Sequence, residues 1–150
     1  MRLNYNGLSD AAAWTAAGVK LPKHDWKRMC AETAERPVWV HFGAGNIFRG
    51  FIAGLQQRLL DEGEAQAGII AVETFDDEVI EKIYAPHDSM ALAVSLLPDG
   101  GTELAVNASI ARGICADDPA QWGRCAGSSA VPRCSWSAIP SPRRATRCAT

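Results

Sequence analysis

The sequence predicts an α/β fold: a partial Rossmann-like parallel sheet with helices on both faces and an antiparallel hairpin insertion. Three observations support this prediction. An apolar run at 38–42 ends in a glycine-containing turn and continues into an amphipathic segment that reaches Leu60. A second apolar run follows at 68–73, and a hairpin sequence lies at 98–101. Strand, turn and helix in this order are typical of a dinucleotide-binding βα unit.

Two helices are expected before the glycine turn. Ser9-Asp10 can cap a short helix that ends near Gly18. Residues 24–35 follow as an amphipathic helix, and the strand at 38–42 comes next.

Beyond the turn, the amphipathic segment is expected to stay helical to about Asp61. The second apolar run is apolar throughout, as in a parallel strand whose two faces are both covered. Strands are expected at 89–97 and 102–110, because Pro98-Asp99-Gly100-Gly101 between them is a strong hairpin signal. Asp118-Pro119 is typical of the start of one more helix.

The glycine turn has the chemistry of a phosphate-binding site. Gly43 allows a tight turn off the strand, and Gly45 leaves room for a pyrophosphate to approach the backbone. The helix then presents free N–H groups and the positive end of its dipole. The third glycine of G-x-G-x-x-G would fall at Phe48, so the spacing also fits a structural turn that binds nothing. The candidate cofactor-binding residues are Gly43, Ala44, Gly45, Asn46, Ile47, Phe48, Arg49 and Glu73.

The letters around the turn are more specific than its spacing. VHFGAGNIFRGF, from Val40 to Phe51, resembles the first nucleotide-binding turn of the mannitol dehydrogenase family of long-chain polyol and hexuronate dehydrogenases. In that family an aromatic residue followed by Arg replaces the third glycine, as Phe48-Arg49 does here. The resemblance covers roughly residues 4–122. It implies NAD-dependent oxidation of the CH–OH group of a hexitol or hexuronate (fructuronate- or mannonate-type), or the reverse reduction, with NADP as the alternative cofactor.

The acid after the second strand bears on this choice of cofactor. Glu73 can accept hydrogen bonds from the ribose hydroxyls and would repel a 2′-phosphate, which favours NAD over NADP. Asp76 and Asp77 are alternatives, and each could instead cap the helix that follows. Arg49 can approach a phosphate, pair across the domain or simply be solvated.

Other reactive side chains are assigned to the scaffold. His41 lies within the strand and is expected to be a core histidine, and His87 is expected to support a turn. Cys30 and Cys115 are interpreted as small apolar fillers. No spacing indicates a metal site. No catalytic residue is assigned, since the resemblance implies that the lysine base and its Asn and His partners belong to a C-terminal helical domain, which we expect to be absent.

Composition and charge exclude several classes of function. The chain has 150 residues and a formal charge of −2, which gives no reason to expect a nucleic-acid or anionic-membrane partner. No run is long and apolar enough to span a bilayer, and the first residues lack a signal-peptide apolar region. A cytoplasmic location is therefore expected, and the family resemblance implies a small sugar alcohol or sugar acid as the partner.

The last residues differ in composition from the rest. Every Asp and Glu lies at or before Asp118, whereas five Arg follow it among Ser, Pro and Ala. Back-translation with freely chosen codons and a one-nucleotide shift gives LRRLFRGPALQLVSYSITEKGYALRD, in which ITEKGY resembles a later motif of the same family. We therefore expect 1–122 to be the N-terminal part of a dinucleotide-binding domain and 123–150 to be an out-of-frame, disordered tail. A genuine disordered tail is the alternative.

Three functions remain open at this point. The first is a catalytically inactive fragment of a dehydrogenase, and the second is a non-catalytic nucleotide-binding module. The third is a structural α/β domain whose turn binds nothing. In each case the unpaired edge and uncovered apolar face of half a sheet predict that the chain folds poorly.

Overall fold

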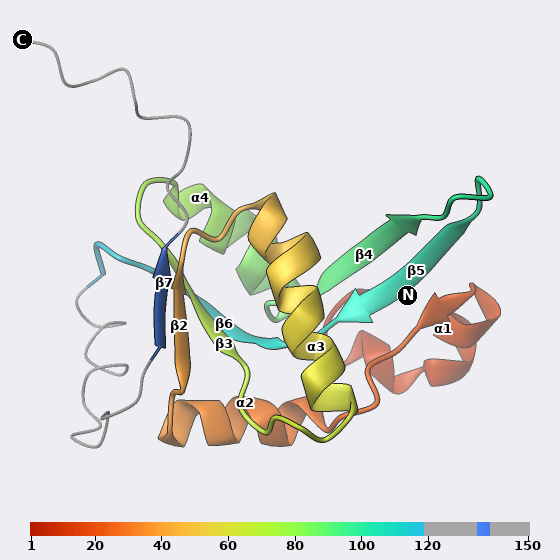
Figure 1. Cartoon of the computed structure of the whole chain (residues 1–150), viewed down its shortest axis with the longest axis horizontal. Coiled ribbons are helices and arrows are strands. Elements are labelled where there is room, and N and C mark those ends of the chain that lie inside the picture. The colour runs from red at the N-terminus through yellow and green to blue at the C-terminus, as the bar shows by residue number, and fades with distance from the viewer. Residues whose placement is uncertain (119–134, 139–150) are drawn as a thin grey trace, which may run out of the picture.

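Helices and strands alternate up to η4, and strands follow one another after it, in the computed structural model, which describes residues 1–118 and 135–138 (Figure 1). The elements, in chain order, are η1 (Gly7–Ser9), α1 (Ala11–Ala16), β1 (Val19–Lys20), α2 (Trp26–Glu35), β2 (Trp39–Phe42), η2 (Phe48–Ile52), α3 (Ala53–Asp61), β3 (Ile69–Glu73), α4 (Asp77–Val79), η3 (Ile80–Tyr84), η4 (Ala85–His87), β4 (Ala91–Leu96), β5 (Thr102–Asn107), β6 (Ile110–Cys115) and β7 (Ser135–Ala138).

A parallel sheet with the strand order β6-β3-β2-β7 forms the centre of the fold. Its strands β2 and β3 pair from Trp39 with Ile69 to Phe42 with Val72. The right-handed crossover rule for parallel strands explains why η2 and α3 return the chain across one face of this sheet. The predicted α/β fold with a parallel sheet is therefore confirmed.

A second, mixed sheet has the order β1-β5-β4. Strands β4 and β5 are antiparallel, from Ala91 opposite Asn107 to Leu96 opposite Thr102, and Gly100 in their connection has φ 84°. A positive φ at this place suits glycine, so the predicted hairpin insertion is confirmed. In Figure 1 the hairpin extends away from the parallel sheet.

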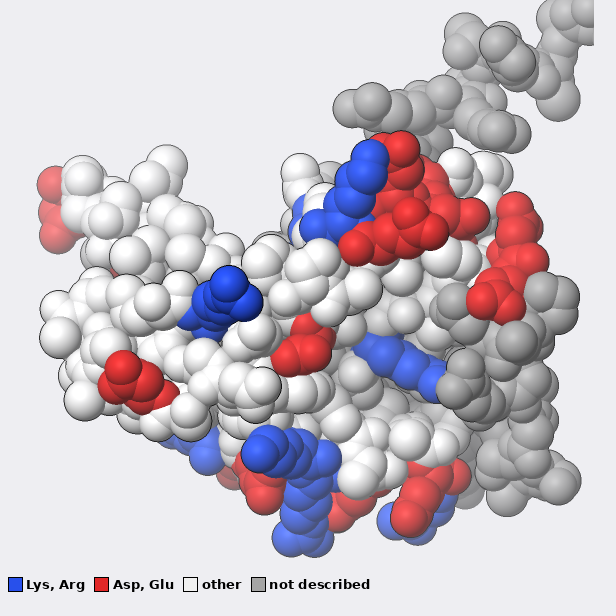
Figure 2. Space-filling model, turned by 180° about the vertical axis from the view of Figure 1, so that it is seen from behind, with Lys and Arg blue, Asp and Glu red and all other residues white. Residues whose placement is uncertain are grey.

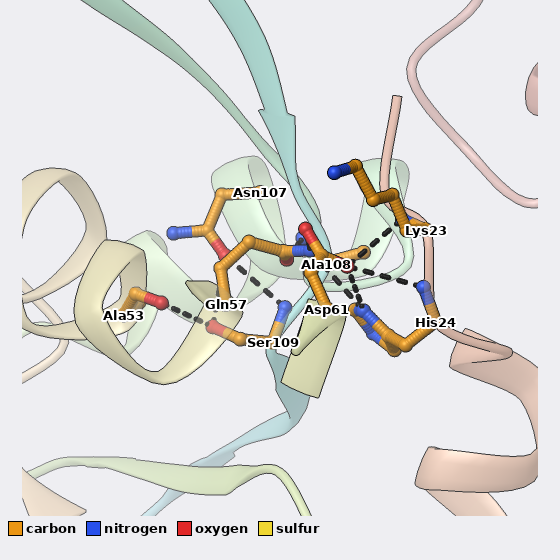
Figure 3. Close-up of polar contacts among 8 residues, drawn as sticks. All are labelled: Lys23, His24, Ala53, Gln57, Asp61, Asn107, Ala108 and Ser109. Carbon is orange, nitrogen blue, oxygen red and sulfur yellow. Dashed lines mark hydrogen bonds and ion pairs between the residues drawn. The ribbon is translucent and has the colours of Figure 1, made fainter. Parts of the chain in front are cut away.

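The strand expected at 102–110 is instead two strands in different sheets. Strand β5 ends at Asn107 and β6 begins at Ile110, next to β3. Between them Gln57 Oε1 accepts the Ala108 amide at 2.8 Å, and the Ser109 hydroxyl donates to the Ala53 carbonyl at 2.6 Å (Figure 3). These bonds from α3 replace the strand ladder, which lets the chain change sheets.

The C-terminal end of α3 is fixed by one carboxylate. Asp61 Oδ1 accepts the backbone amides of Lys23 and His24 at 2.8 and 3.1 Å, and it contacts His24 Nδ1 at 2.8 Å (Figure 3). Gln57 donates to the other carboxylate oxygen at 3.0 Å. The helix that begins at the glycine turn is thereby anchored at its far end to the N-terminal segment.

The two faces of the parallel sheet pack into separate clusters. On one face, Ile69 and Ala71 of β3 pack in a cluster with residues of η2, α3 and η3. On the other face, Ile70 and Val72 belong to a second cluster. Helix α2 lies at the second face, where Thr33 Oγ1 accepts the Gly68 amide at 2.8 Å. Asp10 and Asp25 cap α1 and α2 through the amides of Ala13 and Arg28, as expected of these residues.

The tail expected to be disordered contains a strand. Strand β7 is parallel to β2, with Trp39 opposite Ser135 and Phe42 opposite Ala138, so for these four residues the expectation of disorder is wrong. The rest of 123–150 and the helix expected from Pro119 lie outside the described residues. Within the described ranges, no helix has the length and apolar character needed to cross a membrane.

Large apolar side chains remain exposed on two neighbouring elements. On the helix after the glycine turn they recur every four residues, and on β4 they alternate, as in faces that are normally covered. They are Ile47, Phe51, Leu55 and Leu59 on the helix and Leu92, Val94 and Leu96 on the strand. This exposure is in line with the predicted poor folding of the isolated chain.

We predict that Gly113→Ala destabilises the protein. A Cβ at this position of β6 would lie 2.7 Å from Tyr84 Cδ1 and 2.8 Å from Ile80 Cδ1, which leaves no room without movement of η3. Overpacking of this kind costs about 1–3 kcal/mol of unfolding free energy, measurable by urea denaturation. Gly54→Ala is the control, because its Cβ meets nothing within 4 Å, and it should stabilise α3 by about 0.5–1 kcal/mol. Equal effects of the two substitutions would contradict the packing.

Candidate functional site

The glycine turn presents one exposed and one buried side. Gly43 has φ 103°, which only glycine adopts readily, and its amide donates to the Val72 carbonyl at 2.8 Å. Gly45, Asn46 and Ile47 are exposed, and helical backbone begins at Asn46. A Cβ on Gly45 would meet nothing within 4 Å, so the space above this residue is open. The first amides of a helix have no intrahelical partner, so those at this helix start are available to a ligand.

The helix begins earlier than the expected amphipathic segment and contains a π-helical turn. Element η2 continues directly into α3, so the helix runs from 46 to Asp61. Phe48, at the place of the missing third glycine, is 2% exposed and stacks on His41 with ring centroids 4.2 Å apart. It therefore packs the helix onto β2, and only its backbone can take part in the predicted cofactor site.

The buried side of the turn is held by a tyrosine that the sequence analysis missed. Tyr84 donates its hydroxyl proton to the Ala44 carbonyl at 3.0 Å, and burial raises the pKa of Tyr84 above its usual value. Ala44 is fully buried. No local signal marks Tyr84, because its partner lies 40 residues earlier in the chain.

Glu73 points toward the turn instead of toward solvent. Its Oε2 accepts the Ala44 amide at 3.0 Å, and its Oε1 accepts the amides of Thr74 and Phe75 at 3.0 and 3.1 Å. The residue is 8% exposed. Both carboxylate oxygens thus have backbone donors, and the Ala44 amide, expected in the cofactor cradle, is already engaged. Glu73 joins the turn after β2 to the turn after β3.

Acidic side chains surround the end of β3. Asp76 precedes α4 without a side-chain capping bond, and Asp76, Asp77, Glu78 and Glu81 are exposed. In Figure 2 a patch of acidic side chains, in red, lies at this end of the molecule with basic atoms, in blue, beside it. The ion pair of Glu78 with Lys82, at 2.8 Å, neutralises part of the charge. The negative charge of this patch would repel a phosphate group placed near the end of β3.

Arg49 contacts the start of the helix and the tyrosine that supports the turn. Its guanidinium donates to Asn46 Oδ1 and lies 5.8 Å from the centre of the Tyr84 ring. Its carbonyl accepts Asn107 Nδ2 at 3.2 Å. Both Arg49 and Asn46 line a cavity of about 340 Å³ between η2, η4 and β4. The role of Arg49 at a cofactor phosphate stays a prediction.

The histidines have scaffold contacts. His41 is 1% exposed, as a core histidine should be, and burial lowers its pKa. His87 Nδ1 lies 3.0 Å from the Leu3 carbonyl, which ties the N-terminal segment to η4 as a turn-supporting residue would. Among the residues that the structure describes, no group of three or more His, Cys, Asp or Glu could hold a metal ion.

Comparisons with known proteins give one fold and one sequence relationship. No family model matches the chain. It is 46% identical over 117 residues, 78% of its length, to D-mannonate oxidoreductase of Thermotoga maritima, of which it covers 22%. Mannitol 2-dehydrogenase of Pseudomonas fluorescens, solved as a ternary complex with NAD and D-mannitol, matches with a TM-score of 0.66 and 26% identity, over 81% of this chain and 23% of that one. D-sorbitol dehydrogenase in substrate-free form shares the fold, with a TM-score of 0.64, 24% identity and the same coverage. The chain thus spans less than a quarter of the length of each relative.

We predict that Glu73→Gln loosens the glycine turn. One carboxylate oxygen becomes an NH₂ group, which cannot accept, so at least one buried backbone amide loses its partner. The expected loss of unfolding free energy is about 1–3 kcal/mol in urea denaturation, with a changed amide NMR shift at Ala44, Thr74 or Phe75. Glu81→Gln makes the same chemical change on the exposed acidic patch and should stay within about 0.5 kcal/mol. An unchanged stability of Glu73→Gln would mean that these bonds do not hold the turn.

Proposed function

We propose that this chain, which belongs to the mannitol dehydrogenase family, carries the pyrophosphate-binding part of an NAD site at Gly43, Gly45, Asn46 and Ile47. The observation that carries the proposal is the open space over Gly45 at the start of a helix that runs to Asp61. The backbone amides at 45–47 and the helix dipole would bind the two phosphates. A related structure contains NAD, which supports this choice of ligand.

The residues around the turn would act mainly by holding it. Gly43 reverses the chain, Glu73 engages the Ala44 amide, and Phe48 and Tyr84 fill the space beneath. Preorganised amides lose little conformational freedom when a ligand binds, so a rigid turn strengthens binding. In this proposal Ala44 and Phe48 are part of the support and make no direct contact with the phosphates.

We propose NAD over NADP as the cofactor. Glu73 keeps its carboxylate beside the turn, and its Oε2, which accepts the Ala44 amide, has a second lone pair for a ribose hydroxyl. Asp76 already lies exposed at the end of β3. Either acid can accept from the ribose hydroxyls, and the acidic patch of Asp76, Asp77, Glu78 and Glu81 disfavours a 2′-phosphate.

The activity proposed for the whole family polypeptide is oxidoreduction of a secondary alcohol of a hexitol or hexuronate. When bound, the nicotinamide would supply hydride transfer, and this chain would supply binding and orientation of the dinucleotide. The sugar acids are favoured slightly, because the match to D-mannonate oxidoreductase has the higher sequence identity. The chain by itself is expected to be inactive, since no general base for this reaction is identified in residues 1–118.

We also propose that the sequence from about Gly123 is out of frame. Strand β7 lies beside β2, where a Rossmann sheet places its next strand, so the tail retains one strand-forming segment. The nucleotide sequence around this codon would decide the point.

A non-catalytic nucleotide-binding module is the second candidate function, because the exposed turn is complete without any catalytic residue. Activity of the frame-corrected polypeptide on fructuronate, tagaturonate or mannitol would exclude it.

We predict that the full chain binds NADH and that Gly45→Val weakens binding at least about tenfold, because the side chain occupies the space needed by the pyrophosphate. NADPH should also bind at least about tenfold more weakly than NADH. Isothermal titration calorimetry measures both affinities. Gly54→Val is the matched control on the same helix, and its NADH affinity should equal that of the unchanged chain. Folded protein without measurable NADH affinity would refute the proposed function.

A further inference from the structure

The cavity beside η2 adjoins the exposed side of the glycine turn and includes Asn46 in its lining. It has a volume of about 340 Å³, at the lower end of the ~300–1,000 Å³ range of ligand pockets. Its apolar wall includes Leu3, Ile83 and Leu92, from three different parts of the chain. Its polar lining includes Asn46, Arg49 and His87. No Asp or Glu is among the residues that line it.

The charge of Arg49 is not compensated in the described part of the chain. No ion pair involves it there, and its side-chain hydrogen bond goes to the neutral amide oxygen of Asn46. Its Nε is buried without a hydrogen-bond partner. The Tyr84 ring, 5.8 Å away, offers a π face but no negative charge. The half-buried guanidinium thus carries a permanent charge with no acid beside it, and an anionic ligand would complement that charge.

The other two polar groups limit what the ligand can be. Arg49 can only donate, so Asn46 must turn Oδ1 toward it, which leaves the Asn46 Nδ2 protons for a ligand. His87 donates from Nδ1 to the Leu3 carbonyl, so only its Nε2 is left for a ligand. The permanent positive charge of the lining lies at Arg49, with one amide donor beside it.

We propose that this cavity binds a small organic carboxylate with an apolar body. The carboxylate would accept from the Arg49 guanidinium and from Asn46 Nδ2, and the apolar body would contact Leu3, Ile83 and Leu92. Carboxylate matches the planar fork of a guanidinium, and the apolar wall would gain nothing from a fully hydrated ion such as phosphate. The inference needs only this chain's own residues and does not depend on NAD binding.

The test compares benzoate with benzamide, which has the same shape and no charge, by calorimetric titration of the full chain. Benzoate should bind at least about tenfold more tightly, because a hydrogen bond to a charged group exceeds one to a neutral group by that order. Inorganic phosphate is the third ligand and should bind more weakly than benzoate. Equal affinity for benzoate and benzamide would overturn the proposal, as would phosphate binding as tight as benzoate.

Two variants locate the ligand. Arg49→Gln should reduce benzoate affinity at least about tenfold without changing benzamide affinity. Gly50→Leu should reduce the affinity for both ligands, because Gly50 lines the cavity and a Cβ there meets nothing within 4 Å. Gly54→Leu adds the same side chain to the same helix outside the cavity lining and should leave both affinities unchanged. Unaltered benzoate binding in Gly50→Leu would overturn the assignment, even if Arg49→Gln failed to fold.

Saturation with NADH separates this inference from the proposed function. Benzoate affinity that is unchanged by NADH supports a separate site, and a chain that binds benzoate but no NADH refutes only the cofactor proposal. Competition between NADH and benzoate would mean that Arg49 belongs to the cofactor site, and the separate carboxylate site would then be wrong.

Discussion

The carboxylate of Glu73 fixes the geometry on which the site depends. It accepts one amide from the turn after β2 and two from the turn after β3, so the carboxyl ends of the two strands cannot move independently. A buried carboxylate requires such donors, because an unpaired charge in the protein interior is strongly disfavoured. The same bonds hold Ala44 in the core and leave Gly45 at the surface. The exposed and buried sides of the turn are therefore set by one side chain.

The helix after the turn transmits this constraint to the rest of the fold. Its first turn is packed onto β2 by Phe48, and its last turn is bound to the N-terminal segment by Asp61. Gln57 and Ala53, in between, hold the segment at which the chain leaves the mixed sheet for the parallel one. The other side of this helix carries exposed apolar residues. The position of the helix is therefore set by the contacts on its buried side and at its two ends.

Much of the architecture could be predicted because the signals are local. The apolar runs, the capping residue Asp10 and the hairpin sequence each act within a few residues, and the structure confirms them. The division between β5 and β6 could not be predicted in this way. Ala108 and Ser109 look like strand continuation, and their hydrogen bonds to residues of α3 exist only after the helix has packed.

The sequence by itself determined that a glycine turn lies between a strand and a helix, since Gly43 and Gly45 act through their own backbone conformation and missing side chains. Only the tertiary structure decided which polar side chains contact the backbone near the turn. Glu73 reaches the Ala44 amide across 29 residues of chain, and Asn107 reaches the Arg49 carbonyl across 58. Such contacts depend on which distant segments meet, because a buried charge turns toward whatever donors or cavities packing places beside it.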